Sequence, residues 1–419
     1  MHYELRNRTP RRAEQGFTLI EVITSLFVLT ILLVACLALF DFSAKIARAQ
    51  THVAELQQSL RIGQYQMLRQ VRMAGRGGLL RGPFPQSTAV HVRNNVGDPE
   101  YIAIGNAASP KIVPGTDVLT VRGVFSTPIY HINPPGAALV LDLDADENPV
   151  AGSVQIRDPI PETGVSQDLQ PLIDAVDRRD ALVIVSPLGG GLYAVVELDP
   201  DHARTDTSDD SNVVLGFQIT GGVRSAEFLA ISPGGIFPQE LRSVGYVGLL
   251  EEHRYYVREQ FEIDGDPTSL PKHRLAQAEF YPGTQAAYAG DANNLAIDIA
   301  DNFIDLQVAL GVDTDFDLTV EEDSPPTTTD EWLYNHVDDD PTTDLTKWNG
   351  GTQTPKLFFA RITSLAQTDR RDFRHVDLPI DRVEDRVYGE GATPADATEA
   401  IARNHRRRLL QSVVDMRNL

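Results

Sequence analysis

Two short acidic runs have the residue types and spacing of ligands for a hard cation. Carboxylate or amide oxygens recur at every second position of each run, and Ca²⁺ takes roughly 6–8 such oxygens in a tight loop. The candidate ligands are Asp142, Asp144, Asp146 and Asn148 in the first run, and Asp313, Asp315, Asp317 and Glu321 in the second. The other interpretation is a pair of solvated acidic turns, which need no metal.

Neither run completes the calcium-binding loop of an EF-hand. That loop needs a glycine at its sixth position and a bidentate glutamate at its twelfth. Here Glu147 and Leu318 occupy the sixth positions, and Ser153 and Ser324 occupy the twelfth. The second run is the better candidate because it directly follows an expected strand and lies beside further acids.

No catalytic motif accompanies these acids. The sequence lacks HExxH, GxSxG and GxxxxGK(S/T), and its 10 histidines are scattered without metal-ligand spacing. The single cysteine, Cys36, excludes an intrachain disulfide and multi-thiolate zinc sites. We therefore expect no enzymatic activity.

One further acid, Glu21, lies where a carboxylate is costly. Residues 17–40 are mostly apolar and carry this one formal charge, and about 20 apolar residues span a bilayer as a helix. An acid in lipid costs roughly 2.5–3.5 kcal/mol on insertion scales. Glu21 is either tolerated at the interface or paired with a cation. Cleavage between Gly16 and Phe17 would create such a cation, an α-amine one helical turn away.

The residues before the apolar run predict its orientation in the membrane. Four arginines lie among residues 1–16 against two glutamates, and a basic flank stays in the cytoplasm. A cleavable secretory signal is the rival interpretation. It is disfavoured because the run exceeds the usual ~7–15 residues and no small-x-small site closes it.

The run Gly16–Glu21 after a short basic leader resembles the class III signal of type IV pilins and type II secretion pseudopilins. The resemblance implies that a prepilin peptidase cuts after Gly16 and methylates Phe17. It also implies that Glu21 neutralises the amine of an adjacent subunit during assembly.

One long helix is expected to carry these residues. Apolar or small residues recur every three or four positions from Ile46 to Ala74, which predicts a helix with one apolar stripe. Glycines at 75, 77 and 78 should end it. The stripe would pack on the chain's own globular region or on neighbouring helices of a filament. The expected divisions are 1–16 (leader), 17–40 (transmembrane half), 41–78 (amphipathic half) and 79–419 (globular region).

The expected fold class is α+β, with the long N-terminal helix packed on a large antiparallel β-rich region. Short β-type runs separated by Gly, Pro and Asp predict this region. They lie at 88–93, 117–125, 138–144, 153–157, 181–187, 193–198, 213–220, 226–232, 246–250, 254–258, 275–281, 303–311 and 357–364. Residues 393–415 could form a helix or a strand. The region could be one domain or two lobes, divided within Asp199–Asn212 or near Pro233–Gly245.

Further segments resemble PilW-type minor pilins over most of the chain. They are Arg72–Gly75, Gly115–Val121, Ile304–Val308, Gly311–Asp315, Arg406–Arg408 and Val414–Asn418. The family usually has a glycine-bearing run after the fourth segment, whereas this chain has Phe316, Asp317 and Leu318 there. The Asp- and Pro-rich segment that continues to Trp348 is also longer than usual in the family.

The resemblance implies a minor pilin that primes a type IV pilus or sits at its tip. Its partners would be the prepilin peptidase, other minor pilins, the major pilin and a tip adhesin. It would lie in the inner membrane, with its bulk in the periplasm, before reaching the pilus tip at the cell surface. Twitching motility and cell adhesion follow by association. The net charge of -22 disfavours nucleic-acid binding. The alternatives are a J-type pseudopilin of type II secretion, or a pilin-anchored adhesin that binds through acidic loops at 199–212 and 313–344.

Overall fold

The computed structural model describes the chain from residue 18 to residue 416, with gaps. The described residues are 18–76, 89–97, 111–132, 139–143, 145, 149–160, 163–178, 181–185, 193–199, 212–218, 245–261, 271–280, 296–322, 330–336, 356–372, 375–391 and 393–416. They belong to two compact units, one that ends at Ala54 and one that begins at Glu55.

The described elements follow in this order: α1 (Leu19–Met73), β1 (Val90–Arg93), β2 (Lys111–Ile112), β3 (Val118–Gly123), β4 (Tyr130–His131), β5 (Leu139–Leu143), β6 (Pro149–Arg157), α2 (Gln170–Arg178), β7 (Ala181–Val185), β8 (Tyr193–Leu198), β9 (Asn212–Gln218), β10 (Tyr246–Leu249), β11 (Glu251–Phe261), β12 (Pro271–Phe280), β13 (Ala296–Asp301), β14 (Phe303–Asp313), β15 (Trp332–Leu333), β16 (Lys356–Gln367), β17 (Arg382–Val383), β18 (Arg386–Val387), α5 (Ala397–Ala402) and β19 (Arg407–Asp415).

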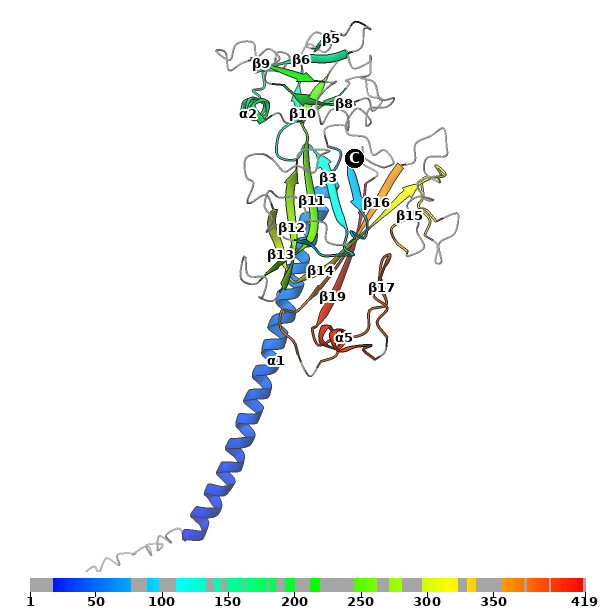
Figure 1. The fold of residues 1–419 in the computed structure, drawn as a ribbon. Helices are drawn as coiled ribbons and strands as arrows, with labels where there is room; N and C mark the ends of the chain where they lie inside the picture. Colours follow the sequence, from blue (N-terminus) through cyan, green and yellow to red (C-terminus); the bar gives the residue numbers. More distant parts are fainter. Residues whose placement is uncertain are drawn as a thin grey trace, which may run out of the picture. The chain divides into compact units, whose positions relative to one another are not determined.

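Helix α1 is uninterrupted along its length (Figure 1). In the first unit its apolar side chains from Leu19 to Phe42 are exposed. In the second unit one face is buried at positions three or four residues apart, as the sequence predicts. The buried apolar residues are Leu56, Leu60, Met67 and Val71.

The helix ends where its glycines begin. Gly75 has φ +79°, a conformation that favours glycine, and its N–H donates to the carbonyl of Arg122 at 2.9 Å. The last helical residue is Met73, so the expected end near Ala74 is confirmed. A second glycine, Gly63, lets the helix approach the sheets, since a Cβ there would lie 2.7 Å from the ring of Phe303.

The strands of the second unit form three main sheets, and every described strand pair is antiparallel. Sheet A has the order β1-β3-β11-β12-β13, with β2 also pairing β11. Sheet B has the order β4-β10-β7-β8-β9-β6-β5, and sheet C the order β15-β14-β16-β19. Strands β17 and β18 form a separate hairpin. Sheet B is an insertion, because the chain leaves sheet A after β3 and re-enters it at β11.

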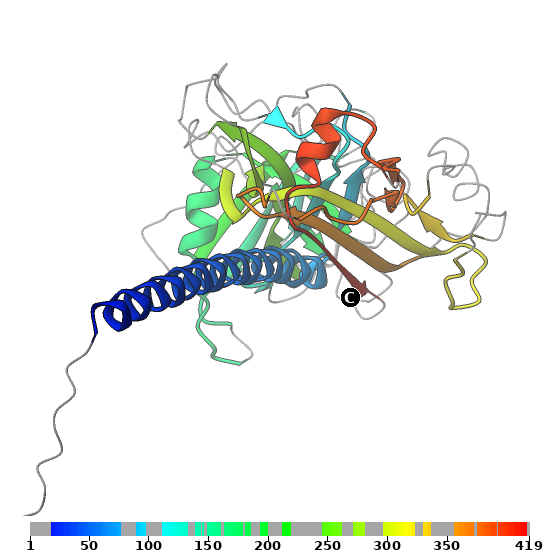
Figure 2. The same cartoon turned by 90° about the horizontal axis from the view of Figure 1, so that it is seen from below.

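Two hydrophobic cores correspond to this division. The larger joins the C-terminal half of α1 to sheets A and C. Figure 2 shows the strands of sheet C side by side, with β19 in dark red last in the row. The second core lies between α2 and sheet B. A smaller cluster that includes Val118, Tyr256 and Phe280 is also buried on sheet A.

The α+β fold class is confirmed, and most expected strands are present within a few residues of their expected bounds. For residues 393–415 a helix or a strand was expected, and the structure has both: a short helix (α5) is followed by a strand (β19). Helix α2 and strand β13 were not predicted, and the strand expected at 226–232 lies outside the described residues. The chain changes from sheet B to sheet A at Leu250, after both of the loops where a division into lobes was considered.

Candidate functional site

Glu21 closes the first turn of α1. Its Oε2 accepts hydrogen bonds from the N–H and the Oγ1 hydroxyl of Thr18, both at 2.9 Å, and its own N–H donates to Thr18 Oγ1 at 3.4 Å. This reciprocal arrangement is a capping box. The cap was not predicted, although a threonine three residues before a glutamate is its usual pattern. No donor among the described residues contacts Oε1, so this oxygen can accept from another chain.

The hydroxyl groups of the apolar half are satisfied within the helix. Thr24 Oγ1 donates to the carbonyl of Ile20 at 2.9 Å, Thr30 Oγ1 donates to that of Leu26 at 2.7 Å, and the Ser25 hydroxyl donates to that of Glu21. Such bonds let small polar residues enter an apolar medium, because no donor is left without an acceptor.

Among the described residues, α1 is the one helix that is long and apolar enough to cross a membrane. Its apolar side chains are exposed all round in the first unit, which suits lipid or neighbouring helices. Gly16 and Phe17 lie outside the described residues, so cleavage and methylation at these positions stay predictions.

Three aspartates of the second acidic run lie together in the turn after β14. One carboxylate oxygen from each of Asp313, Asp315 and Asp317 lies within 4.8 Å of the others. Glu321 does not belong to this group, although its N–H donates to Glu331 Oε2 at 3.2 Å. Three carboxylates supply only part of the coordination that Ca²⁺ takes, so backbone carbonyls or water would complete it. Calcium binding here stays a prediction.

The turn is held by the innermost of these acids. Asp313 accepts from the N–H of Phe316 at 2.7 Å and from the N–H of Leu318 at 3.2 Å. Phe316 has φ +67° and Leu318 has φ +71°, a conformation that glycine adopts most easily. The chain therefore keeps a turn that suits glycine while carrying larger side chains.

The first acidic run lies mostly outside the described residues. Asp142 belongs to β5 and is exposed, and nothing is described of Asp144, Asp146 and Asn148. A calcium site there stays a prediction.

Two of the segments that resemble PilW-type proteins contact each other. The N–H of Asp117 donates to the carbonyl of Leu306 at 2.9 Å. In return, Asp117 Oδ2 accepts from the N–H of Val308 at 2.7 Å. Gln307 Nε2 donates to the carbonyl of Gly115 at 2.9 Å. These contacts join sheet A to sheet C, a connection that was not predicted from the sequence.

Three buried aspartates cluster at this junction. Asp305 accepts from Arg386 Nη1 at 2.8 Å and from the hydroxyl of Tyr388 at 2.6 Å. Burial raises the pKa of Asp305 and raises that of Asp117 well above its usual value, and the nearby carboxylate of Asp385 raises the latter further. Asp117 therefore keeps a proton more easily than an exposed aspartate does.

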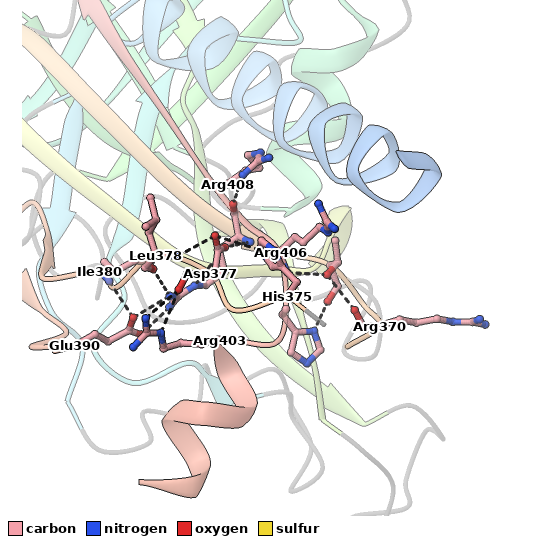
Figure 3. Close-up of polar contacts among 12 residues, drawn as sticks. Arg370, His375, Asp377, Leu378, Ile380, Glu390, Arg403, Arg406 and Arg408 are labelled. Carbon is pink, nitrogen blue, oxygen red and sulfur yellow. Dashed lines mark hydrogen bonds and ion pairs between the residues drawn. The ribbon is translucent and has the colours of Figure 1, made fainter. Parts of the chain in front are cut away.

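The arginine triplet 406–408, at the start of β19, fixes the segment that joins β16 to β19 (Figure 3). Arg407 donates to both oxygens of Glu390, at 2.6 and 2.8 Å, and its N–H donates to Asp377 Oδ2 at 2.5 Å. Arg403 donates to the carbonyls of Asp377 and Gly391. Burial alone would raise the pKa of Glu390, but the bonds from Arg407 outweigh it and the pKa lies below its usual value. Arg406 and Arg407 are paired with Asp372 and Glu390, so these two arginines hold the segment in place.

Comparison with known proteins identifies one feature. The family model described as the prokaryotic N-terminal methylation motif matches residues 11–37. This range contains Gly16, Phe17 and Glu21. Neither the curated proteins nor the solved structures include a match to this chain.

The matched motif and the helix that follows it agree with each other. The motif supports a pilin-like protein, and an exposed apolar helix near the N-terminus fits attachment to a membrane and contact with pilus components. The remainder of the chain, beyond residue 37, lies outside the match.

Proposed function

We propose that this chain is a minor pilin, of the PilW type, that primes assembly of a type IV pilus or sits at its tip. The observation that carries the proposal is the match at residues 11–37, which runs directly into the exposed apolar half of α1. The same motif is expected of pseudopilins, so a J-type pseudopilin of type II secretion is the second candidate.

The mechanism is assembly and not catalysis. Cleavage after Gly16 would expose the α-amine of Phe17, and methylation would leave it positively charged. Glu21 of a neighbouring subunit would accept this amine through Oε1, since Oε2 is already engaged by Thr18. A buried carboxylate is destabilising without its cation, so pairing would fix the register of one helix against the next.

The bulk of the second unit favours the tip over the shaft. A repeating subunit must leave room for the subunits stacked above it, whereas a tip subunit need not. The partners would then be other minor pilins, the major pilin and a tip adhesin, with the prepilin peptidase acting beforehand in the inner membrane.

The role of Glu21 is tested by variants that separate its charge from its helix cap. Glu21→Gln keeps a side chain that can complete the capping box but removes the charge. Thr18→Ala removes the cap and keeps the charge. We expect Glu21→Gln and Glu21→Ala to remain in the membrane while their amount in sheared pili falls at least tenfold. Thr18→Ala should assemble within about twofold of wild type.

Two measurements complete the test. Mass spectrometry of the membrane-bound protein should find methylated Phe17 as the first residue, and a chain that still begins at Met1 contradicts the proposal. So does recovery of Glu21→Gln in pili at wild-type amounts. A deletion strain that keeps its pili but fails to export exoproteins would assign the chain to type II secretion instead.

A further inference from the structure

Strand β19 is the edge strand at one end of sheet C, and we call its unpaired side the open margin. It pairs with β16 on one side, through a register that runs from Phe359 opposite Asp415 to Gln367 opposite Arg407. No described strand pairs with its other side. A strand in this position presents a row of backbone donors and acceptors to whatever lies beside it.

The direction of each backbone group follows from two hydrogen bonds at the ends of the β16–β19 pair. The N–H of Met416 donates to the carbonyl of Phe358 at 2.7 Å, and the N–H of Thr368 donates to the carbonyl of Arg406 at 2.9 Å. Opposed residues of antiparallel strands alternate between bonded and non-bonded pairs. The even-numbered residues of β19 therefore bond to β16, and the odd-numbered residues face outward.

One outward group is already occupied, which confirms the alternation. The N–H of Arg407 donates to the carboxylate of Asp377 and not to β16. Beyond it, the N–H and C=O groups of Leu409, Gln411 and Val413 face outward in the same way. No acceptor for these three N–H groups occurs among the described residues.

The side chains of this margin are not those that natural proteins use to block a free strand. Leu409 is 51% exposed and Val413 is 53% exposed. Protected margins usually carry proline, an inward-pointing charge or a bulge, and residues 409–413 contain none of these. The margin therefore exposes apolar side chains together with unpaired backbone donors.

Helix α1 covers one face of this strand. Gln64 Nε2 donates to the carbonyl of Leu410 at 2.6 Å, and the hydroxyl of Ser412 donates to Gln64 Oε1 at 2.8 Å. Gln66 points the other way, to Gln277 of sheet A. These two contacts fix which side of the helix lies over β19.

Helix geometry then places two cations beside the open margin. Each residue turns an α-helix by about 100°, so Arg61 and Arg72 lie on the β19 side of Gln64 and away from sheet A. Arg408 has the same parity as Ser412, so its side chain lies on the same face of β19. All three are exposed, and no carboxylate among the described residues pairs with them. A chain of net charge -22 thus has a positive flank along its open strand.

We propose that the open margin of β19, together with Arg61, Arg72 and Arg408 beside it, binds an extended segment of another protein. In this segment apolar and acidic residues alternate. The segment adds a fifth strand to sheet C. Its backbone pairs with Leu409, Gln411 and Val413, its apolar side chains cover Leu409 and Val413, and its acids meet the arginines. A second copy of this chain fits less well, because it would bring the same three arginines to the contact.

The test uses the full chain in detergent and a labelled, end-blocked peptide in which valine alternates with aspartate. Fluorescence anisotropy should show saturable binding. Val413→Pro removes one outward donor without breaking the bonds to β16, and proline is tolerated at such positions. We expect it to weaken binding at least tenfold, whereas Val413→Thr, which keeps the N–H, stays within about twofold.

A second set of variants tests the contribution of the arginines. The double variant Arg61→Glu, Arg72→Glu should weaken binding at least tenfold, and Arg157→Glu, an exposed arginine on β6, should not. A peptide with lysine in place of aspartate should bind at least tenfold more weakly than the original.

Several results would overturn the inference. They are the absence of saturable binding, equal binding by Val413→Pro with an unchanged circular dichroism spectrum, and equal binding of the lysine peptide. A dimer in light scattering that Val413→Pro dissociates would assign the margin to a second copy instead. These measurements do not depend on pilus assembly, so the proposed function can fail while this inference stands.

Discussion

The backbone at Leu318 is strained. Its φ of +71° lies in the left-handed region, where an L-residue costs roughly 1–2 kcal/mol, and its side chain is 64% exposed, so little packing offsets this cost. Glycine loses about 0.5–1 kcal/mol through its greater freedom in the unfolded chain. We therefore expect Leu318→Gly to stabilise the protein by about 0.5–1 kcal/mol, measured by chemical denaturation.

A matched substitution separates strain from the loss of a leucine. Leu378 is 80% exposed and its φ is not positive. Leu378→Gly should therefore reduce stability by about 0.5–1 kcal/mol. If both glycine variants lose stability equally, strain at Leu318 is not significant.

The three aspartates after β14 give a prediction about metal binding. Asp315 and Asp317 are exposed, whereas Asp313 holds the turn through two backbone N–H groups. We therefore expect Asp315→Asn and Asp317→Asn to weaken Ca²⁺ binding at least tenfold without unfolding the turn. Asp174→Asn on α2 is the control. Titration calorimetry of the full chain measures this, and no heat from Ca²⁺ with the wild-type chain would leave the acidic turn as solvated surface.

Among the elements, the junction of β3 with β14 gives a prediction about pH. Asp117 has a raised pKa because it is buried and faces Asp385. A raised folded-state pKa stabilises the protein fully below the unfolded value of about 3.9, and this stabilisation is lost as pH rises through the folded-state value. Asp385→Asn removes the facing charge and should lower the pKa of Asp117. The decline in melting temperature with rising pH should then be smaller and should end at a lower pH.

The control for this prediction is an acid far from the junction. Asp174→Asn on α2 should leave the pH profile unchanged. An identical profile for Asp385→Asn would mean that Asp385 does not set the titration of Asp117. Circular dichroism melts at a series of pH values from about pH 4 upward measure this decline.

The elements that depend on local pattern were predictable, and those that depend on long-range pairing were not. The helix end at Met73 and strand β8 follow from glycine placement and periodicity. By contrast, the motif segments around Asp117 and Leu306 gave no indication that they contact each other, because 191 residues separate Val308 from Asp117. The edge position of β19 could not be predicted either, because the order of strands in a sheet depends on residues far apart in the sequence.

Some features of the candidate site were likewise predictable from the sequence, and others were not. The position of Glu21 in an apolar run could be recognised from the sequence, because charge and hydropathy depend only on neighbouring residues. Its capping contact with Thr18 is also local and could have been predicted. The exclusion of Glu321 from the aspartate group could not be predicted, because the backbone N–H of Glu321 bonds to Glu331, ten residues further along the chain.

For the molecule as a whole, the division at Ala54 predicts which part of the chain folds alone. From residue 55 onward α1 supplies four buried apolar side chains to the larger core: Leu56, Leu60, Met67 and Val71. Burial of such side chains contributes roughly 1.5–3 kcal/mol each, which together is comparable to the whole stability of a typical domain.

A fragment of residues 55–419 should therefore be soluble and cooperatively folded, whereas a fragment of residues 81–419, which lacks α1, should not be. Gel filtration, near-ultraviolet circular dichroism and binding of a hydrophobic dye distinguish the two outcomes. The Gly63→Leu variant of the longer fragment is a point test of the same contact, because a Cβ at Gly63 would lie 2.7 Å from Phe303 and 2.8 Å from Leu275. It should destabilise the fragment by several kcal/mol through overpacking. If the fragment without α1 folds as well as the longer one, the helix is an accessory to the sheets and does not form part of their core.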